Sequence, residues 1–591
     1  MHVLVTAGHV DHGKSALVRA LTGMEPDRLA EEHRRGMTLD LGFVWTRLAG
    51  SDIAFVDVPG HERFVPTMLA GAGPVPAVLF VVAADQGWQE QSAEHLAILD
   101  ALGVTHGLLA ITRADLADPA PALALARERL ARTSLGTVEA VPVSGVTGHG
   151  LPELRAAVER LVSRLPAPVT SGRVRLFVDR AFTVRGAGTV VTGTLAAGRL
   201  RVGESLEVAP GGRVGRIRGL QALGRPAESV QAVARVAVNL RDVPVAGIAR
   251  GSALVTPGAW VSTLRLDVRL TDLDPADLPG DLVLHLGSAA VACRVRPLAG
   301  AAARLTLRTP LPATAGDRAV LREPSRRLVT GVIVLDVDPP DLRRRGAARA
   351  LGEDLAARSD VIDPRAEIAR RGAVTRSRLA ALGVLRLDAA VPDGILERAG
   401  LLVDPDAWER WKAELVDQVD AHGRREPLQP GMSGEAARRA LGLPDLGLVD
   451  PLVAELGGTL ALRDGRISRL GSAPVFDAAQ DAALASWAAR LEANPYDAPT
   501  AEEIAGSGLT ARSVAAAGRS GRFLVLPGPV ILHPAAADRA LATLATLPQP
   551  FTMSQARQAL GATRRVAVPL LEHLDACGGT VRVDGSRRRL R

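Results

Sequence analysis

Apolar runs of strand length alternate with amphipathic segments over residues 1 to about 166. The strand-like runs lie at 3–6, 53–58, 78–84, 107–112 and 138–143. The segments between them, beginning with 16–21, carry apolar residues at helical spacing. This alternation predicts a mostly parallel sheet covered by helices, in which ligands bind at the carboxyl ends of the strands.

The pattern changes near residue 170 and again near residue 341. Short alternating runs broken by glycine cover 174–255, and a second all-β stretch covers about 264–337, so we expect two small antiparallel barrels. Beyond 341, helical runs repeatedly end in a pair of β-like runs. Residues 437–465 and 556–585 echo each other, which indicates repeated modules of about 60 residues with the winged-helix plan.

The first predicted strand and helix are joined by a loop with the pattern Gly-x-x-x-x-Gly-Lys-Ser. Its glycines permit backbone angles that bring N–H groups close to phosphate oxygens. Lys14 is placed to reach the β- and γ-phosphates, and Ser15 to hold Mg²⁺. Lys14 is one of only two lysines in the chain. The expected nucleotide-binding residues of this loop are Gly8, His9, Val10, Asp11, His12, Gly13, Lys14 and Ser15.

A second phosphate motif, Asp-Val-Pro-Gly-His, spans the end of the run at 53–58. Asp57 is placed to hold Mg²⁺ through water, and Gly60 to donate its N–H to a γ-phosphate. His61 follows, where a side chain can orient the attacking water. Thr38, in Arg35-Gly36-Met37-Thr38, is a candidate second hydroxyl ligand of Mg²⁺. The alternative for Thr38 is a turn or N-cap threonine.

A third motif follows the run at 107–112 and indicates guanine. Asp115 can accept hydrogen bonds from guanine N1–H and from its N2 amino group, a donor pair that adenine lacks. A backbone N–H at Ser144-Gly145 can reach guanine O6 after the run at 138–143. The expected base-binding residues are Thr112, Arg113, Asp115, Ser144 and Gly145.

Together these motifs resemble the translational GTPases, the family of elongation factor Tu. The resemblance implies GTP hydrolysis with Mg²⁺, stimulated by the ribosome, with His61 as the catalytic residue and Ser15, Thr38 and Asp57 at the metal. The usual guanine motif is Asn-Lys-x-Asp, and here Thr112-Arg113 stand in place of Asn-Lys. Thr112 lacks the amide that normally ties loops together, so we expect a looser hold on the nucleotide.

The first barrel is similar to one branch of this family, the selenocysteine-specific elongation factors (SelB). The similarity lies in the runs 179–184 and 231–239. It implies an aminoacyl pocket formed by Asp179, Arg180 and Arg235. A selenol is more acidic than a thiol, so an arginine would favour ionised selenocysteine over neutral serine. The alternative is a salt bridge of the barrel wall between Asp179 and Arg235 or Arg180.

The last expected module is the basic one, and the SelB resemblance implies four winged helices, of which the last binds a hairpin in selenoprotein mRNA. Arginine offers forked bonds to phosphate and stacks on flipped bases. The alternative for the terminal residues is a solvated basic tail. Trp408, Trp411 and Trp487 sit on apolar helical faces and are expected in cores. The expected RNA-binding residues are Arg564, Arg565, Arg582, Arg587, Arg588 and Arg589.

The chain as a whole therefore predicts a multidomain protein: an α/β P-loop GTPase domain, two β-barrels and an array of winged-helix modules. The expected bounds are 1–166 for the GTPase domain, 170–260 and 262–340 for the barrels, and 347–412, 413–470, 473–534 and 535–591 for the winged helices.

Composition agrees with a nucleic-acid partner. The net charge of +7 favours an anionic partner. Cys293 and Cys577 have no ligand spacing around them, which indicates a reducing compartment and argues against zinc or disulfides. No apolar stretch of the sequence reaches the length of a membrane span, so we expect a cytoplasmic protein, without a membrane partner and monomeric.

The sequence thus predicts a GTP-dependent factor that delivers selenocysteinyl-tRNA to the ribosome at in-frame UGA codons, tethered to an mRNA hairpin. Two alternatives remain. One is a winged-helix regulator of transcription gated by GTP, whose C-terminal modules would prefer duplex DNA. The other is a general translational GTPase without selenocysteine specificity, in which Arg235 would be structural.

Overall fold

The computed structural model describes residues 1–26, 38, 40–48, 50–61, 64–73, 75–186, 188–323, 328–342, 346–359 and 362–591. The tripeptide Arg35-Gly36-Met37 lies outside the described residues. The chain forms two compact units, one made of 1–370 with 375–392 and the other of 371–374 with 393–591.

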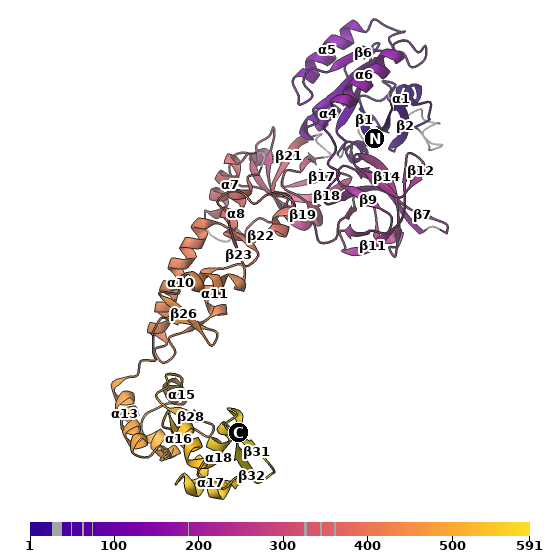
Figure 1. Ribbon diagram of the computed structural model, residues 1–591. Helices are drawn as coiled ribbons and strands as arrows, with labels where there is room; N and C mark the ends of the chain where they lie inside the picture. The colour runs from indigo at the N-terminus through magenta and orange to yellow at the C-terminus, as the bar shows by residue number, and fades with distance from the viewer. Residues whose placement is uncertain are drawn as a thin grey trace. The chain divides into compact units, whose positions relative to one another are not determined.

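The N-terminal domain contains a six-stranded sheet in the order β2-β3-β1-β4-β5-β6 (Figure 1). Five strands are parallel, as the apolar alternation predicts, and β4 is buried along its whole length because helices cover both faces. The edge strand β2 runs antiparallel to β3 and was not expected from the sequence. The strands are β1 (His2–Ala7), β2 (Gly42–Leu48), β3 (Ser51–Asp57), β4 (Ala77–Ala83), β5 (His106–Thr112) and β6 (Glu139–Pro142).

Two apolar layers hold the helices against this sheet. Buried side chains of α1 and α6 pack on one face. Those of α3, α4 and α5 pack on the other. The helices are α1 (Lys14–Thr22), α3 (Val65–Ala72), α4 (Glu90–Ala101), α5 (Ala120–Ala131) and α6 (Leu151–Arg164).

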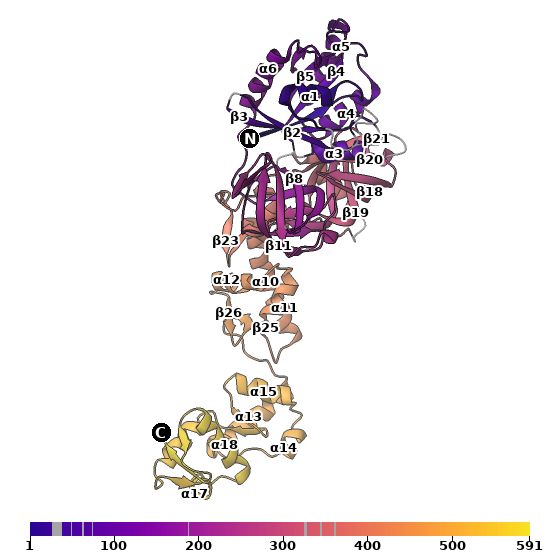
Figure 2. The same ribbon diagram turned by 90° about the vertical axis from the view of Figure 1, so that its right-hand side faces the viewer.

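Two closed six-stranded barrels follow, which confirms the prediction (Figure 2). In the first, β10 pairs with both β15 and β11 and closes the ring, while β12 (Arg225–Ala227) extends its edge. Its strands are β7 (Arg175–Val184), β8 (Gly188–Leu195), β10 (Ser205–Ala209), β11 (Arg213–Ala222), β14 (Ala234–Arg241) and β15 (Ala253–Val255). The short strands β9 (Arg199–Arg201) and β13 (Ser229–Gln231) pair separately.

In the second barrel, β16 pairs with both β19 and β21 and closes the ring. Burial alternates along β18, because every second side chain points into the apolar interior. Its strands are β16 (Val261–Leu270), β17 (Asp281–Leu286), β18 (Ala289–Pro297), β19 (Ala302–Ala313), β20 (Arg318–Glu323) and β21 (Leu328–Asp336).

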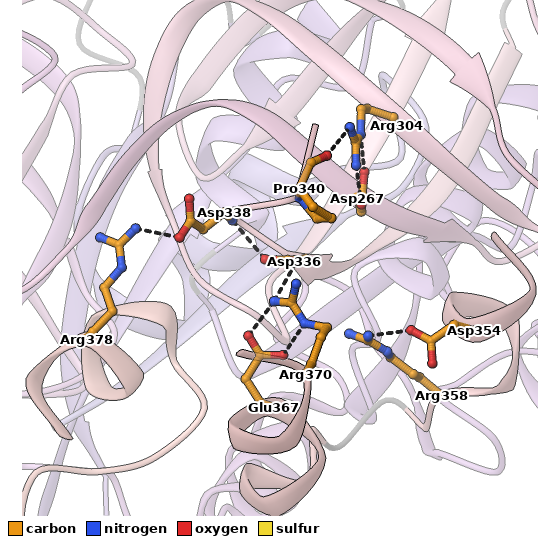
Figure 3. A network of polar contacts seen from close by, with 10 residues as sticks. All are labelled: Asp267, Arg304, Asp336, Asp338, Pro340, Asp354, Arg358, Glu367, Arg370 and Arg378. Carbon is orange, nitrogen blue, oxygen red and sulfur yellow. Dashed lines mark hydrogen bonds and ion pairs between the residues drawn. The ribbon is translucent and has the colours of Figure 1, made fainter. Parts of the chain in front are cut away.

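A polar network ties the helices after the second barrel to the end of β21 (Figure 3). Arg370 lies 2.9 Å from the buried carboxylate of Asp336 and 2.6 Å from that of Glu367. Arg378 donates to Asp338 over 2.7 Å. The helices of this segment are α7 (Ala347–Ala357), α8 (Pro364–Arg371) and α9 (Arg376–Leu382).

The same network reaches a buried ion pair in the barrel wall. Arg304 on β19 donates to both carboxylate oxygens of Asp267 on β16, over 2.7 and 2.9 Å. The side chains of Arg304 and Asp267 are 6% and 0% exposed. Arg304 also donates to the carbonyl of Pro340, 2.7 Å away (Figure 3). Two charges taken out of water are tolerated here because each is fully bonded to the other.

The remaining chain repeats helices followed by short hairpins, as predicted. One helix, α10 (Pro405–Arg425), runs unbroken through the expected border at 412. Its apolar stripe, with Trp408 and Trp411, is buried, and so is Trp487 on α13, which confirms that these tryptophans are core residues. Among the described residues, no helix combines the length and the apolar character needed to cross a membrane.

The first two hairpins of this region are short. Their strands and the helices between them are β22 (Ala373–Thr375), β23 (Leu396–Arg398), β24 (Leu401–Val403), β25 (Met432–Ser433), α11 (Gly434–Leu441), α12 (Val449–Glu455), β26 (Leu460–Arg463) and β27 (Arg466–Arg469). The last two repeats comprise α13 (Ala478–Ala493), α14 (Ala501–Gly506), α15 (Ala511–Arg519), β28 (Leu524–Leu526), β29 (Val530–Leu532), α16 (Ala536–Leu544), β30 (Phe551–Thr552), α17 (Met553–Ala559), α18 (Arg564–Ala576), β31 (Thr580–Arg582) and β32 (Arg587–Leu590).

The buried pair in the second barrel gives a stability prediction. Arg304→Ala leaves the Asp267 carboxylate buried without its partner, so we expect the free energy of opening of β16 and β19 to fall by about 3–5 kcal/mol. Native-state hydrogen exchange of the amides in these strands measures it. Arg265→Ala removes an exposed pair with Asp341 on the same barrel and should cost less than about 1 kcal/mol.

A double variant distinguishes the stability lost through an unpaired buried charge from the stability lost through poorer packing. Asp267→Leu combined with Arg304→Met removes both charges and keeps the volume, so it should recover most of the loss. If the Arg304→Ala and Arg265→Ala variants proved equally stable, the buried pair would contribute no more to stability than the exposed pair, and the prediction would be wrong.

Candidate functional site

The glycine-rich loop lies between β1 and α1, as predicted, and its conformation requires glycine. Gly8 has φ +134°, and a Cβ there would lie 2.1 Å from the carbonyl oxygen of Val81. Gly13 has φ +79° and caps α1. Lys14 is buried, and its Nζ donates to the carbonyls of Gly8 and His9 over 3.1 and 2.8 Å. An ammonium and the first N–H groups of a helix thus converge on one loop, an arrangement suited to phosphate.

The three predicted metal residues come together beside this loop. Ser15 Oγ donates to Oδ2 of Asp57 over 2.6 Å and lies 2.8 Å from Oγ1 of Thr38. The other carboxylate oxygen of Asp57 accepts from Thr6 over 2.7 Å. Carboxylate and hydroxyl oxygens are the ligands that Mg²⁺ prefers, so this set of donors fits that ion.

Gly60 packs directly against the glycine-rich loop. A Cβ at Gly60 would lie 2.5 Å from the backbone nitrogen of Val10 and 2.6 Å from Nζ of Lys14. His61 follows it at the surface of the site, half-buried, with its ring centroid 6.1 Å from that of Phe64. The two predicted residues of this motif therefore lie at the phosphate end of the loop.

Two side chains of α4 hold loop amides, and the sequence reasoning did not include them. The N–H of Gly8 donates to Nδ1 of His95, and that of Val10 to Oε1 of Gln91, each over 3.1 Å. Burial, aided by the charge of Lys14, lowers the pKa of His95 to about 3, so its imidazole is neutral and can accept. The partners lie more than 80 residues apart in sequence, and no local pattern joins them.

The guanine motif is hydrogen-bonded to the glycine-rich loop. The hydroxyl of Thr112 donates to the carbonyl of His12 over 2.7 Å, so a connection to the loop is present without the amide, and the looser hold on the nucleotide stays a prediction. Arg113 donates to Asp85 over 2.9 Å and to the carbonyl of Asp11. The motif is therefore fastened to the loop by both residues that depart from the family pattern.

The other three base-binding candidates lie where β5 and β6 end. The N–H of Ala114 donates to the carbonyl of Val143, which holds the two strand ends together. Ser144 is buried, and its hydroxyl accepts from the N–H groups of Val146 and Thr147 over 3.3 and 3.1 Å. Asp115 and Gly145 are exposed beside it and available to a ligand.

A cavity of about 250 Å³ lies between β2 and the first barrel. Its lining includes Phe43, Trp45, Arg180, Phe182, Thr192 and Arg235. Arg235 bonds both carboxylate oxygens of Asp179, and its guanidinium lies 3.7 Å from the ring centroid of Phe43. Thr192 donates to the same carboxylate over 2.7 Å. The salt bridge that the sequence offered as the alternative is thus present, and Arg235 also lines a cavity, while the aminoacyl role of these residues stays a prediction.

The arginines of the last module divide into two groups. Arg588 is buried, and its Nε donates to Asp575 over 3.0 Å, while Arg565 donates to the carbonyl of Ala498 over 2.7 Å. Arg582 lies 3.2 Å from Asp575. Arg564 at the start of α18, and Arg587 and Arg589 on β32, are exposed, and so are Arg565 and Arg582 despite their contacts.

Comparisons with known proteins agree along the chain. Residues 1–164 match the elongation factor Tu GTP binding domain, 263–341 the beta-barrel domain of selenocysteine-specific elongation factor, and 542–589 the winged helix of elongation factor SelB. The chain is 31% identical to a selenocysteine-specific elongation factor of Desulfomicrobium baculatum, over 100% of this chain and 99% of that one. It is 35% identical to the factor of the same name from Escherichia coli K12, over 77% and 76%.

The fold agrees as well. A crystal structure of a bacterial selenocysteine-specific elongation factor, EF-Sec, matches with a TM-score of 0.78 and 25% identity over 100% of both chains. The match includes the α/β domain, both barrels and the C-terminal modules. The chain is therefore a translational GTPase, and it belongs to the family of selenocysteine-specific elongation factors (SelB).

Proposed function

We propose that this GTPase delivers selenocysteinyl-tRNA to the ribosome at in-frame UGA codons while its last winged helix holds a hairpin of the mRNA. It acts in the cytoplasm as a monomer, with the domain bounds expected from the sequence except at 412, where α10 continues through the border. The observation that carries the proposal is the guanidinium of Arg235 in the wall of the cavity beside β2. The other motifs fit any translational GTPase, whereas a cation at this position selects an anionic side chain.

In the proposed reaction, the residues of the glycine-rich loop and of the guanine motif have separate tasks in binding and hydrolysing GTP. Lys14 and the N–H groups at the start of α1 bind the phosphates, and Asp115 with Ser144 and Gly145 binds guanine. Ser15, Thr38 and Asp57 would hold Mg²⁺, which neutralises the charge that develops on the phosphate oxygens. His61 orients a water toward the γ-phosphorus. The oxygen of that water bonds to the γ-phosphorus as the bond from this phosphorus to the β–γ bridging oxygen breaks, a proton of the water passes to a phosphate oxygen, and GDP and inorganic phosphate leave.

The proposed selection of the amino acid depends on the charge of its side chain. A selenolate is anionic at neutral pH, whereas the hydroxyl of serine is neutral. The fork from Arg235 to Asp179 uses two of the five N–H groups of a guanidinium, which leaves donors for an anionic ligand. The low polarity of Phe43 and Trp45 strengthens such a bond. We therefore expect a preference for selenocysteine that depends on the arginine.

Arg235→Ala tests this preference. We expect the affinity for selenocysteinyl-tRNA to fall by about 10- to 100-fold, the value of a charge-assisted hydrogen bond of about 1.5–3 kcal/mol. GTP binding should be unchanged. The measurement is protection of the aminoacyl ester against hydrolysis, with seryl-tRNA in parallel. Arg201→Ala, on the exposed strand β9 of the same barrel, is the control. Equal protection of both esters by the unaltered protein would refute the proposed cargo.

Thr112→Val tests the guanine motif. The valine keeps the shape but leaves the carbonyl of His12 without its donor, so we expect the dissociation constants of GDP and GTP to rise by about 5- to 30-fold. Equilibrium binding of a fluorescent guanine nucleotide measures them. Thr112→Ser keeps the hydroxyl and should bind like the unaltered protein. If Thr112→Val bound nucleotide as tightly as the unaltered protein, the hydrogen bond from Thr112 to His12 would have no part in nucleotide binding.

Arg587→Ala combined with Arg589→Ala tests the RNA interface. These exposed arginines would neutralise phosphates, so their loss should weaken binding of a selenoprotein mRNA hairpin and lower the slope of log affinity against log salt by about one to two. Filter binding at several salt concentrations measures both. Arg463→Ala, exposed on the hairpin strand β26, is the matched control. Tighter binding of duplex DNA than of the hairpin would favour the regulator instead.

A further inference from the structure

The segment that carries Thr38 contacts the first barrel through one carboxylate. Asp40 lies two residues after Thr38 and directly before Leu41, at the start of β2. Its Oδ1 accepts from Nη2 of Arg250 over 2.5 Å, and its Oδ2 accepts from Nε of Arg180 over 3.1 Å. Arg180 also donates to the carbonyl of Leu41 over 2.5 Å. Two arginines of the first barrel, Arg180 and Arg250, therefore hydrogen-bond the chain just after Thr38.

The same two arginines flank the residue that holds Arg235. Arg180 follows Asp179 directly on β7. Arg250 donates through Nε to the backbone carbonyl of Asp179 over 3.0 Å. The carboxylate of Asp179 in turn binds Arg235. Asp40 thus lies two residues after Thr38 in the chain, and hydrogen bonds through Arg250 connect it to Asp179, whose carboxylate binds the guanidinium in the cavity.

Asp40 is ionised and half-buried. Burial would raise the pKa of its carboxyl, but the hydrogen bond from Arg250 and the charge of Arg180 outweigh burial and lower it below its ordinary value. Among the described residues, the contacts of this cluster join three guanidiniums, those of Arg180, Arg235 and Arg250, to the two carboxylates of Asp40 and Asp179. Without Asp40, Arg180 and Arg250 would repel each other and lose their shared acceptor, and the backbone of Asp179 would lose part of its support.

We propose that Asp40 is a positioning residue that couples the nucleotide to the aminoacyl pocket. With GTP bound, Thr38 is held at the metal, and Asp40 is thereby held between Arg180 and Arg250, which fix Asp179 and Arg235 for the selenolate. After hydrolysis, Thr38 and Asp40 are released together, and the pocket loses its alignment. The inference rests on the proposed cargo and adds the route by which GTP controls it.

The test is the coupling between two ligands. The dissociation constant of selenocysteinyl-tRNA is measured with a non-hydrolysable GTP analogue and with GDP, and the coupling factor is the ratio of the GDP value to the GTP value. Asp40→Ala should reduce this factor by about tenfold or more, chiefly by weakening the complex with the GTP analogue. Nucleotide affinity without tRNA is measured in parallel, so that lost nucleotide is not mistaken for lost coupling.

Two further variants sharpen the assignment. Arg250→Ala should reduce the factor as Asp40→Ala does, and the double variant should reduce it no further, because both changes break one route. Glu139→Ala is the matched control, since Glu139 bonds Arg160 over 2.5 and 3.3 Å in the same domain, away from the cavity. Its coupling factor should equal that of the unaltered protein.

The outcomes separate the two proposals. If the unaltered protein fails to prefer selenocysteinyl-tRNA over seryl-tRNA, the proposed cargo is wrong. If it shows that preference and a coupling factor that Asp40→Ala leaves intact, the cargo stands and the coupling role of Asp40 is overturned. Equal loss of affinity in both nucleotide states would also overturn it, because that pattern indicates a merely structural carboxylate.

Discussion

The ion pair between Asp179 and Arg235 is the interaction on which the wall between β2 and the first barrel depends. The two side chains are 5% and 13% exposed, and removing each charge from water costs several kcal/mol. The fork between them, the bond from Thr192 and the contact of the guanidinium with Phe43 offset that cost. A pair of apolar side chains would hold the wall equally well, so barrel stability alone does not explain the charges.

Strand β2 explains how this wall can respond to the nucleotide site. Its first residue, Gly42, lies opposite Asp57, and its second, Phe43, contacts the guanidinium of Arg235. Thr38 and Asp57, the proposed metal ligands, lie at the end where β2 begins. The same few residues therefore belong to both sites, which is why the proposed coupling needs no large rearrangement of the domains.

The sequence predicted those features that depend on local pattern. The parallel strands, the glycine-rich loop and the two barrels follow from periodicity and from glycine, and all were confirmed. Strand β2 was missed because its apolar run, Phe43-Val44-Trp45, is only three residues long before Thr46 and Arg47. His95 and Gln91 were missed because their loop partners are distant in sequence. The burial of Arg588 could have been predicted from the sequence. Side chains alternate along β32, which places Arg587 and Arg589 outside and Arg588 inside.

The histidines around the phosphate loop set a lower limit to the pH at which the loop keeps its shape. Burial, with the charge of neighbouring His9, lowers the pKa of His12 to about 4, and burial lowers that of His95 to about 3. In the unfolded chain both would bind a proton below about pH 6.5. The unfolded state therefore takes up more protons than the folded state between these values, and stability falls as the pH drops through this window. Acid thus weakens the nucleotide loop, because the loop depends on neutral imidazoles, one of which accepts the hydrogen bond from the N–H of Gly8.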